Sequence, residues 1–266
     1  MKRNLYTELM AAVVVMTTVG LTWGQVVGTI VTDENKELKG EIRYKARERA
    51  YAIKTGNMEV EWPANRVQEF NIPRPKEMDA AEQQIFGGNP AAAIPTLEKI
   101  VAGYAMLKWD EEATRLLASA YLRSGDTEKA LRACDSIIKT KPEAAYLGVM
   151  APIYWEALIK ANRMTKVEEL LLKAIKEGDA EASAFALIRR GDMILAAGEN
   201  ADNSKKALRD GYLRVTLLYA TCKNALPEAL YKSAKCFDRL GQTGRSDAAR
   251  TQLKSEFPNS EWARKP

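Results

Sequence analysis

Small, aromatic and turn-forming residues recur at helical spacing along the chain, and this recurrence limits the possible folds more than any other feature of the sequence. The clearest unit spans residues 110–144. Ala118 and Tyr121 fall on one face of its first predicted helix, and Ala130 lies in the second, which Asp126 can cap. Two helices joined by a short turn cross closely only where one has a small residue opposite a large side chain of the other. The alanines therefore predict a tightly packed helical hairpin.

Four further units keep the same frame at similar intervals. They span residues 81–104, 154–175, 182–219 and 227–263. Pro95 predicts a kink or a late start in the second helix of the first of these units, and the polar stretch 199–205 predicts a lengthened turn in the third. Because one helical hairpin cannot bury its own apolar face, we expect the stacked hairpins to share a continuous core over residues 77–266.

The unit at residues 110–144 resembles the tetratricopeptide repeat (TPR), which has a period of 34 residues. Its small and aromatic positions match the family's pattern, and Pro142 closes the unit as the family's proline does. The tryptophan-like first position departs from the family, because Thr114 stands there. The resemblance implies a mainly α fold, a TPR-type helical-hairpin solenoid of about five hairpins.

The last unit resembles one group of TPR proteins in particular. It contains SAKCFDRLG at residues 233–241 and FPNSEWA at residues 257–263. These stretches look like the closing repeat of exported bacterial cell-envelope proteins, such as the lipoprotein of the outer-membrane β-barrel assembly machine and the periplasmic coordinator of the Tol–Pal system. Those proteins are non-catalytic scaffolds that hold protein partners, and the resemblance implies that role here. The chain differs from the first in lacking a lipidation cysteine and from the second in lacking a coiled-coil start.

Residues 25–72 follow a different pattern and predict a small β module. In residues 37–46 every second side chain is apolar or small, which is typical of a half-buried antiparallel strand. Further strands are predicted at residues 26–32, 50–55, 58–62 and 67–72. Five short strands with tight turns resemble an SH3-like or Sm-like barrel. Two prolines in residues 73–76 favour an extended chain, so this stretch is the predicted linker to the solenoid.

The composition excludes most enzyme classes. The chain has no histidine, so it lacks Ser-His and Cys-His nucleophile arrangements and the commonest metal ligand. It also has no Gly-rich phosphate loop and no Cys-x-x-Cys pair. We therefore expect no enzyme activity, no cofactor, no metal and no small-molecule substrate. An enzyme that uses lysine or carboxylate chemistry is the alternative.

The charged residues are nearly balanced in sign. There are 40 Lys and Arg against 35 Asp and Glu, which gives a formal net charge of +5. They are spread along the chain without a long basic run. A mixed-charge surface of this kind argues against a nucleic-acid partner.

The first 24 residues have the features of a signal peptide. Lys2 and Arg3 precede an uncharged run at residues 9–21 that is too short to span a bilayer comfortably. Gly24 supplies a small residue before a cleavage point at Gln25. We therefore expect a periplasmic or secreted product, with an uncleaved N-terminal anchor helix as the alternative.

The chain has three cysteines, an odd number for an exported protein. Cys134, Cys222 and Cys236 all fall within predicted helices, at positions where small apolar residues pack. We expect buried thiols. A disulfide between Cys222 and Cys236 is the alternative.

The candidate binding site follows from the resemblance. In TPR proteins the first helix of each hairpin lines a concave surface, and its positions 2, 5, 9, 12 and 13 contact ligands. In residues 110–144 and in the last unit these positions hold Glu112, Arg115, Ser119, Leu122 and Arg123, and Glu228, Tyr231, Lys235, Asp238 and Arg239. The binding residues expected from this frame are Arg115, Ser119, Arg123, Tyr231, Lys235 and Arg239. We expect the basic side chains to face one groove, with Tyr231 as an apolar anchor.

The predicted partner is a protein or peptide. Because arginine can hold a carboxylate through two hydrogen bonds, the ligand expected is an acidic peptide segment or a free C-terminus. The main hypothesis is thus an exported, non-catalytic scaffold in cell-envelope assembly or maintenance. This hypothesis includes association of the protein with the envelope. The alternatives are a structural or self-assembling envelope protein, and a β module that binds a glycan or polymer while the solenoid acts as a spacer.

The predicted signal peptide can be tested directly on the native protein. Cleavage after residue 24 should give a mature chain that begins near Gln25. Intact mass spectrometry of the protein purified from its own cells measures this end. An intact Met1 in a cytosolic fraction would contradict export.

Overall fold

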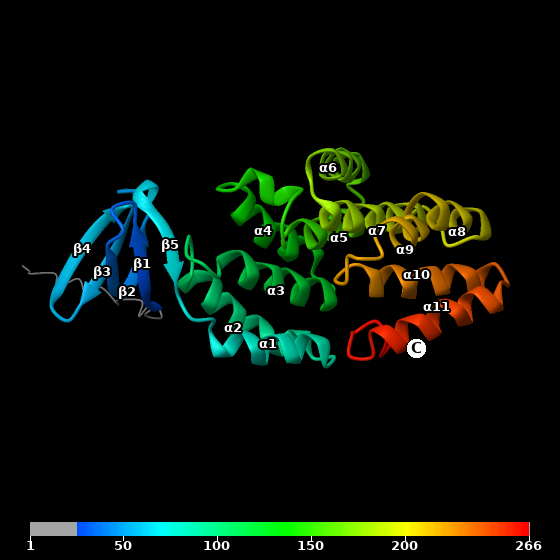
Figure 1. Ribbon diagram of the computed structural model, residues 1–266, viewed down its shortest axis with the longest axis horizontal. Coiled ribbons are helices and arrows are strands. Elements are labelled where there is room, and N and C mark those ends of the chain that lie inside the picture. The colour runs from blue at the N-terminus through cyan, green and yellow to red at the C-terminus, as the bar shows by residue number, and fades with distance from the viewer. Residues whose placement is uncertain (1–25, 266) are drawn as a thin grey trace, which may run out of the picture.

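A small β module and a helical solenoid follow one another along the chain (Figure 1). The computed structural model describes residues 26–265. The predicted signal peptide, residues 1–24, lies outside the described residues. The predicted fold class is confirmed, because the protein is a helical-repeat protein that begins with a five-stranded antiparallel module.

The β module is one antiparallel sheet with the strand order β4-β3-β2-β1-β5. Its strands are β1 (Val26–Thr32), β2 (Glu37–Lys45), β3 (Ala50–Thr55), β4 (Met58–Pro63) and β5 (Val67–Asn71). A 3-10 turn, Ala64–Arg66, leads into β5. The predicted strands are all present, with ends displaced by no more than one residue.

Alternation along the strands puts the apolar side chains on one face of the sheet. Ile42 lies opposite Val26 on β1 and Ile53 on β3, and all three are buried. On the other face Arg43 forms an ion pair with Glu59 on β4, 2.8 Å between nitrogen and oxygen. The period-two pattern of the sequence therefore becomes one buried face and one hydrated face.

The solenoid consists of five helical hairpins. Their first helices are α1 (Lys76–Phe86), α3 (Asp110–Arg123), α5 (Ala151–Lys160), α7 (Ala180–Ala196) and α10 (Leu226–Arg239). Their second helices are α2 (Pro90–Gly103), α4 (Thr127–Ile138), α6 (Met164–Glu177), the pair α8 (Ala201–Ala207) and α9 (Leu213–Leu218), and α11 (Thr243–Glu256). Ala118 and Ala130 are fully buried where α3 and α4 pack, so the predicted close crossing is confirmed.

The core of the solenoid passes through α7. One buried cluster extends from Met78 on α1 to Ala186 on α7, and a second joins Ala184 on α7 to Phe237 on α10. Phe185 packs against both clusters. The hairpins therefore bury their apolar faces against one another, as the repeat pattern requires.

Two details of the predicted hairpins are wrong. The turn before α8 does not extend to residue 205, because the Asn200 side chain accepts a hydrogen bond from the Asn203 amide at 2.8 Å and so begins the helix at Ala201. Of the two alternatives predicted at Pro95, the late start is wrong, since α2 begins at Pro90 and continues through Pro95. A proline this close to the N-terminus removes only one intrahelical hydrogen bond.

The three cysteines are free thiols, and all lie among the described residues. Cys134 and Cys236 are buried, as expected. Burial raises the pKa of the Cys134 thiol to about 12. Cys222 is half-buried and lies in the connection between α9 and α10, so its predicted place in a helix is wrong. The Cys222–Cys236 disulfide is not formed.

Two glycines let α7 and the second helix of its hairpin approach very closely. The helix continues from α8 to α9 through a π-helical segment, Leu208–Tyr212. A Cβ atom at Gly191 would lie 2.5 Å from the Tyr212 ring, and one at Gly211 would lie 2.9 Å from the Gly191 Cα. Tyr212 also donates a hydrogen bond to Asp192 at 2.8 Å, so its ring has little room to move.

The β module is joined to the solenoid by side-chain contacts as well as by the chain. Leu107, in the connection between α2 and α3, is 3% exposed and packs within the β-module core. The Trp109 indole donates a hydrogen bond to the Ile72 carbonyl at 2.9 Å, and the Tyr51 hydroxyl donates one to the Met106 carbonyl at 2.8 Å. The α2–α3 connection therefore forms part of both units.

Substituting Gly191 tests the close helix approach. Gly191→Ala must displace the Tyr212 ring, so we expect a loss of about 1–3 kcal/mol in the free energy of unfolding. Gly244→Ala on α11 is the matched control, because a Cβ there meets nothing within 4 Å. The control should be neutral or slightly stabilising, since alanine favours helix. Urea unfolding followed by circular dichroism measures both, and equal effects of the two substitutions would contradict the predicted crowding.

Candidate functional site

A cavity of about 760 Å³ lies on the inner side of the solenoid. It is lined by side chains of the first helices α3, α5, α7 and α10 and by the last residues of the chain. We call it the concave cavity, and we call residues 257–265, which follow α11, the C-terminal segment. In Figure 1 the inner helices α3, α5, α7 and α10 lie between the second helices α4 and α6 on one side and α11 on the other. The volume lies within the range of ligand-binding pockets in proteins.

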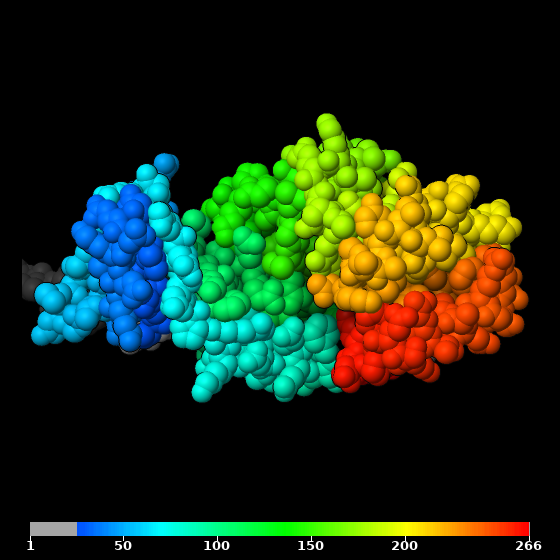
Figure 2. Space-filling model, in the orientation of Figure 1, coloured from blue at the N-terminus to red at the C-terminus, as the bar shows by residue number. Residues whose placement is uncertain are grey.

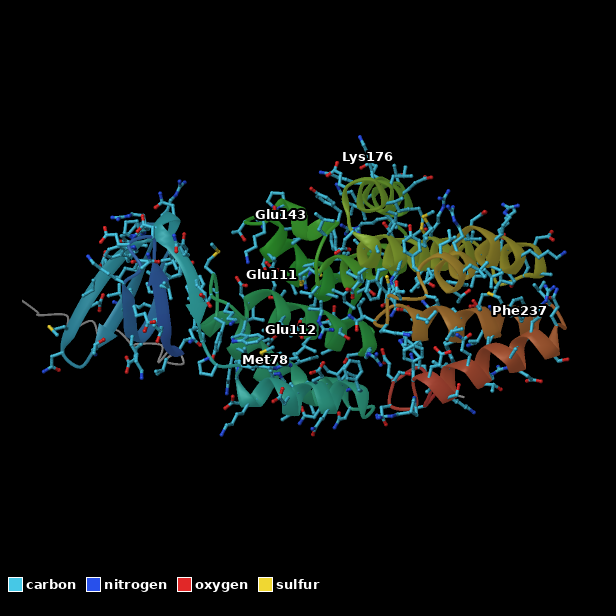
Figure 3. The ribbon with its side chains drawn as sticks, in the orientation of Figure 1. Met78, Glu111, Glu112, Glu143, Lys176 and Phe237 are labelled. Atoms are coloured by element: carbon cyan, nitrogen blue, oxygen red, sulfur yellow. The ribbon has the colours of Figure 1, made fainter. Side chains whose placement is uncertain are left out.

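The second hairpin presents its inner face as the sequence predicts. Five predicted contact positions on α3 line the cavity: Glu112, Arg115, Ser119, Leu122 and Arg123. Figure 3 labels Glu112 at the start of α3, among the inner helices, and Lys176 at the outer edge of α6. The positions taken from the TPR frame therefore line the cavity in this hairpin, and their role in partner binding stays a prediction.

The fifth hairpin differs from the prediction. Of its predicted contact positions only Glu228 lines the cavity. The ring of Tyr231 instead packs against Trp262 of the C-terminal segment, with centroids 5.5 Å apart. Lys235 lies over the Tyr231 ring, and Arg239 forms an ion pair with Glu199 in the α7–α8 connection. The predicted single groove thus brings together Arg115, Ser119 and Arg123 but not Tyr231, Lys235 and Arg239, because the C-terminal segment and a neighbouring connection occupy those positions.

The arginines on α3 already have carboxylate partners. Arg115 forms an ion pair with Glu112 at 2.8 Å and lies 3.6 Å from Glu82 on α1. Burial acts to raise the pKa of Glu112, but its hydrogen bonds and charge interaction with Arg115 hold it below its usual value. Arg123 forms an ion pair with Glu261 of the C-terminal segment at 2.5 Å.

A network of four charges lies between α7 and α10, and two of its members, Arg189 and Glu228, line the cavity. Arg189 lies 2.5 Å from Glu228 and 2.7 Å from Asp192, and Lys232 lies 2.6 Å from Asp192 and 2.7 Å from Glu228. The Arg189 Nε also donates to the Pro152 carbonyl on α5 at 3.2 Å. The network therefore joins three of the inner helices and balances two positive charges with two negative ones.

The pKa values of the buried carboxyl groups reflect this pairing. Burial acts to raise the pKa of Glu228, but the charges of Arg189 and Lys232 outweigh it and hold the pKa below its usual value. Burial acts in the same direction on Asp192, and Lys232 and Arg189 lower its pKa as well. Both carboxyl groups are therefore ionised at neutral pH.

Sequence reasoning missed most of this network. It placed Glu228 at a contact position but did not identify its partners. The sequence carries a signal for them, since Arg189 and Asp192 are spaced i, i+3 and Glu228 and Lys232 are spaced i, i+4 on their helices. That spacing is common on exposed helix faces, so it does not by itself indicate burial between two helices.

The cavity as a whole is mixed in charge rather than basic. Four basic side chains line it: Arg115, Arg123, Arg189 and Lys265. Six acidic side chains line it: Glu112, Glu156, Asp179, Glu181, Glu228 and Glu261. Apolar side chains lie between them: Phe86, Leu122, Val149, Ile153, Trp155, Phe185 and Trp262. The lining therefore offers both apolar and charged contacts.

Comparison with protein families identifies the repeats. Residues 87–153 match one family model and residues 228–260 match another, and both models are described as tetratricopeptide repeat. Each of these two segments is therefore similar to the tetratricopeptide repeat. The first match covers α2, α3 and α4, and the second covers most of α10 and all of α11. TPR domains generally bind protein partners, so these matches support a protein-interaction scaffold.

Other comparisons add no relative. No curated protein and no solved structure matches this chain. Among residues 26–265, no helix combines the length and the apolar character needed to cross a membrane.

The buried charge network predicts a specific pH dependence. A carboxyl group with a lowered pKa in the folded state stabilises the fold above its usual pKa, 4.5 for Glu228 and 3.8 for Asp192, and this stabilisation is lost as the pH falls through the folded value. Glu228→Gln removes one such carboxyl group and leaves Asp192 as the nearest negative charge to the buried Arg189 guanidinium. We expect a loss of about 3 kcal/mol at pH 7, and we expect the difference from wild type to shrink between about pH 5 and pH 2.

Urea unfolding at several pH values measures this difference. Glu143→Gln is the matched control, because Glu143 is exposed in the turn before α5 and has no role in the network. The control should unfold like wild type at every pH. A difference between Glu228→Gln and wild type that stays constant from pH 7 to pH 3 would contradict the proposed role of the network.

Proposed function

We propose that the protein is a non-catalytic scaffold whose concave cavity binds a segment of a protein partner. The main support is that the first helices of four successive hairpins contribute side chains to one cavity of about 760 Å³. The apolar side chains of this lining can bury those of a peptide, and the charged ones can select its sequence.

The chemistry of the partner depends on which cavity arginine can exchange its present carboxylate for one of the partner. The Arg115 side chain is 25% exposed and has two carboxylate partners, Glu112 and Glu82, so an incoming carboxylate would have to replace established pairs there. The Arg123–Glu261 pair is more exposed, with 34% and 28% of the side chains accessible. An acidic segment or a free C-terminus of the partner would therefore bind at Arg123.

We further propose that the protein acts outside the cytoplasm, in assembly or maintenance of the cell envelope. The support is the charged and apolar start of the sequence, and the resemblance of the last repeat to exported envelope TPR proteins. In that setting a scaffold without catalytic residues holds other proteins together.

Site-specific photo-cross-linking in the cells that make the protein tests the proposed function. A photoreactive phenylalanine analogue at Val149, which lines the cavity and is 48% exposed, should give a cross-linked protein partner. The matched control is the same analogue at Leu172, which is 55% exposed on α6 and does not line the cavity. No cross-link from Val149, or the same product from both positions, would contradict partner binding in the cavity.

A further inference from the structure

The C-terminal segment closes one side of the concave cavity. After α11 the chain turns back, and Glu261, Trp262 and Lys265 line the cavity. Figures 1 and 2 show this segment, in red, beside the end of α1, so the last residues of the chain meet the first hairpin of the solenoid. The cavity is therefore bounded by a stretch that belongs to no helix.

Glu261 makes the first contact that holds the segment in place. Its carboxylate lies 2.5 Å from the Arg123 guanidinium, and the two residues are 138 positions apart in the chain. Arg123 also lies over the Phe86 ring, 5.1 Å from its centroid. The ion pair therefore links the end of the chain to both α3 and the end of α1.

Trp262 makes the second contact. Its ring lies 5.5 Å from that of Tyr231 on α10, at an interplanar angle of 42°. The Lys265 ammonium lies 3.5 Å from the centroid of the Trp262 ring, on the same short segment. The indole is thus held between an aromatic ring and a cation, in the way that an aromatic anchor of a peptide is held.

These two contacts fall on positions that the TPR frame assigns to ligand binding. Arg123 is the expected carboxylate-binding residue of the second hairpin, and Tyr231 is the expected apolar anchor of the fifth. Both are taken by consecutive residues of the chain itself, a carboxylate followed by an indole. The C-terminal segment occupies this end of the cavity as a ligand would.

The Arg123–Glu261 ion pair can be exchanged for one with a partner's carboxylate. The Glu261 side chain is 28% exposed and that of Arg123 is 34% exposed, in contrast to 5% and 7% for Glu228 and Arg189 in the buried network. An ion pair at this exposure contributes little to stability, because water screens it. Release of the segment therefore exposes no buried charge, and its cost lies in the apolar contacts of Phe257 and Trp262 with the cluster of Leu226, Leu230 and Leu253.

We propose that the C-terminal segment is an intramolecular occupant of the concave cavity, and that the partner displaces it with a carboxylate followed by an aromatic side chain. This inference rests on the proposed function, since it names the class of partner segment and the regulation of the same cavity. Because the occupant is tethered, its effective concentration is on the order of millimolar. A partner segment must compete with this tethered segment for the cavity. Acidic ligands that bind weakly therefore do not displace it.

A labelled peptide with the sequence of residues 257–265, FPNSEWARK, tests this inference by fluorescence anisotropy. The full chain carrying Glu261→Ala and Trp262→Ala has an open site, so it should bind the peptide about tenfold or more tightly than wild type does. Adding Arg123→Glu or Tyr231→Ala to the open variant should abolish binding. A control peptide with alanine in place of both the glutamate and the tryptophan should bind neither protein.

A second variant keeps the test valid if loss of Trp262 disturbs the fold. Glu261→Lys alone retains the indole but repels Arg123, and it should also bind the peptide more tightly than wild type. Glu143→Lys, at an exposed position in the turn before α5, is the matched charge-reversal control and should bind like wild type. Equal affinities of wild type and both open variants, or no binding by folded open variants, would overturn the inference.

The two proposals can fail separately. If the open variant binds the peptide but Val149 gives no cross-link in cells, the proposal of an intramolecular occupant stands and the proposal of a protein partner is rejected. A Val149 cross-link together with open variants that ignore the peptide would retain the partner and reject the occupant.

Discussion

Close helix crossings at small residues hold the solenoid together, and every other feature depends on them. Ala118 and Ala130 are buried where α3 meets α4, and Gly191 lies directly against the Tyr212 ring where α7 meets its partner helix. A hairpin closed in this way still exposes an apolar face, so each one must stack on the next. Stacking aligns the first helices side by side, and their inner faces then form the wall of the concave cavity.

Charge pairing decides what that wall can bind. The buried network of Arg189, Asp192, Glu228 and Lys232 joins α7 to α10 and leaves no net charge. Arg115 is neutralised in the same way by carboxylates of its own chain. The exchangeable charge lies at Arg123, where the carboxylate partner comes from the C-terminal segment. In the proposed function a partner would exchange this ion pair at the edge of the cavity, because the pairs of the buried network would be costly to break.

The β module shares structure with the solenoid at the α2–α3 connection. Leu107 enters the β-module core while the following Trp109 bonds to the Ile72 carbonyl. Helix α3 begins at Asp110, immediately after this connection, and contributes five side chains to the cavity. The β module therefore contacts the connection that directly precedes the helix carrying Arg115 and Arg123.

The sequence by itself determined the local elements: five strands from alternation, five hairpins from the repeat, and the inner face of α3 from the TPR frame. These features follow from periodicities that a segment carries within itself. Only the tertiary structure decided that Tyr231 packs on Trp262, that Arg123 meets Glu261, and that Glu228 is buried beside Arg189. Each of those contacts joins residues far apart in the chain or on different helices, and local spacing cannot distinguish a charge facing water from one facing a distant partner. The mixed charge and the closed edge of the cavity therefore emerge only when the hairpins have stacked.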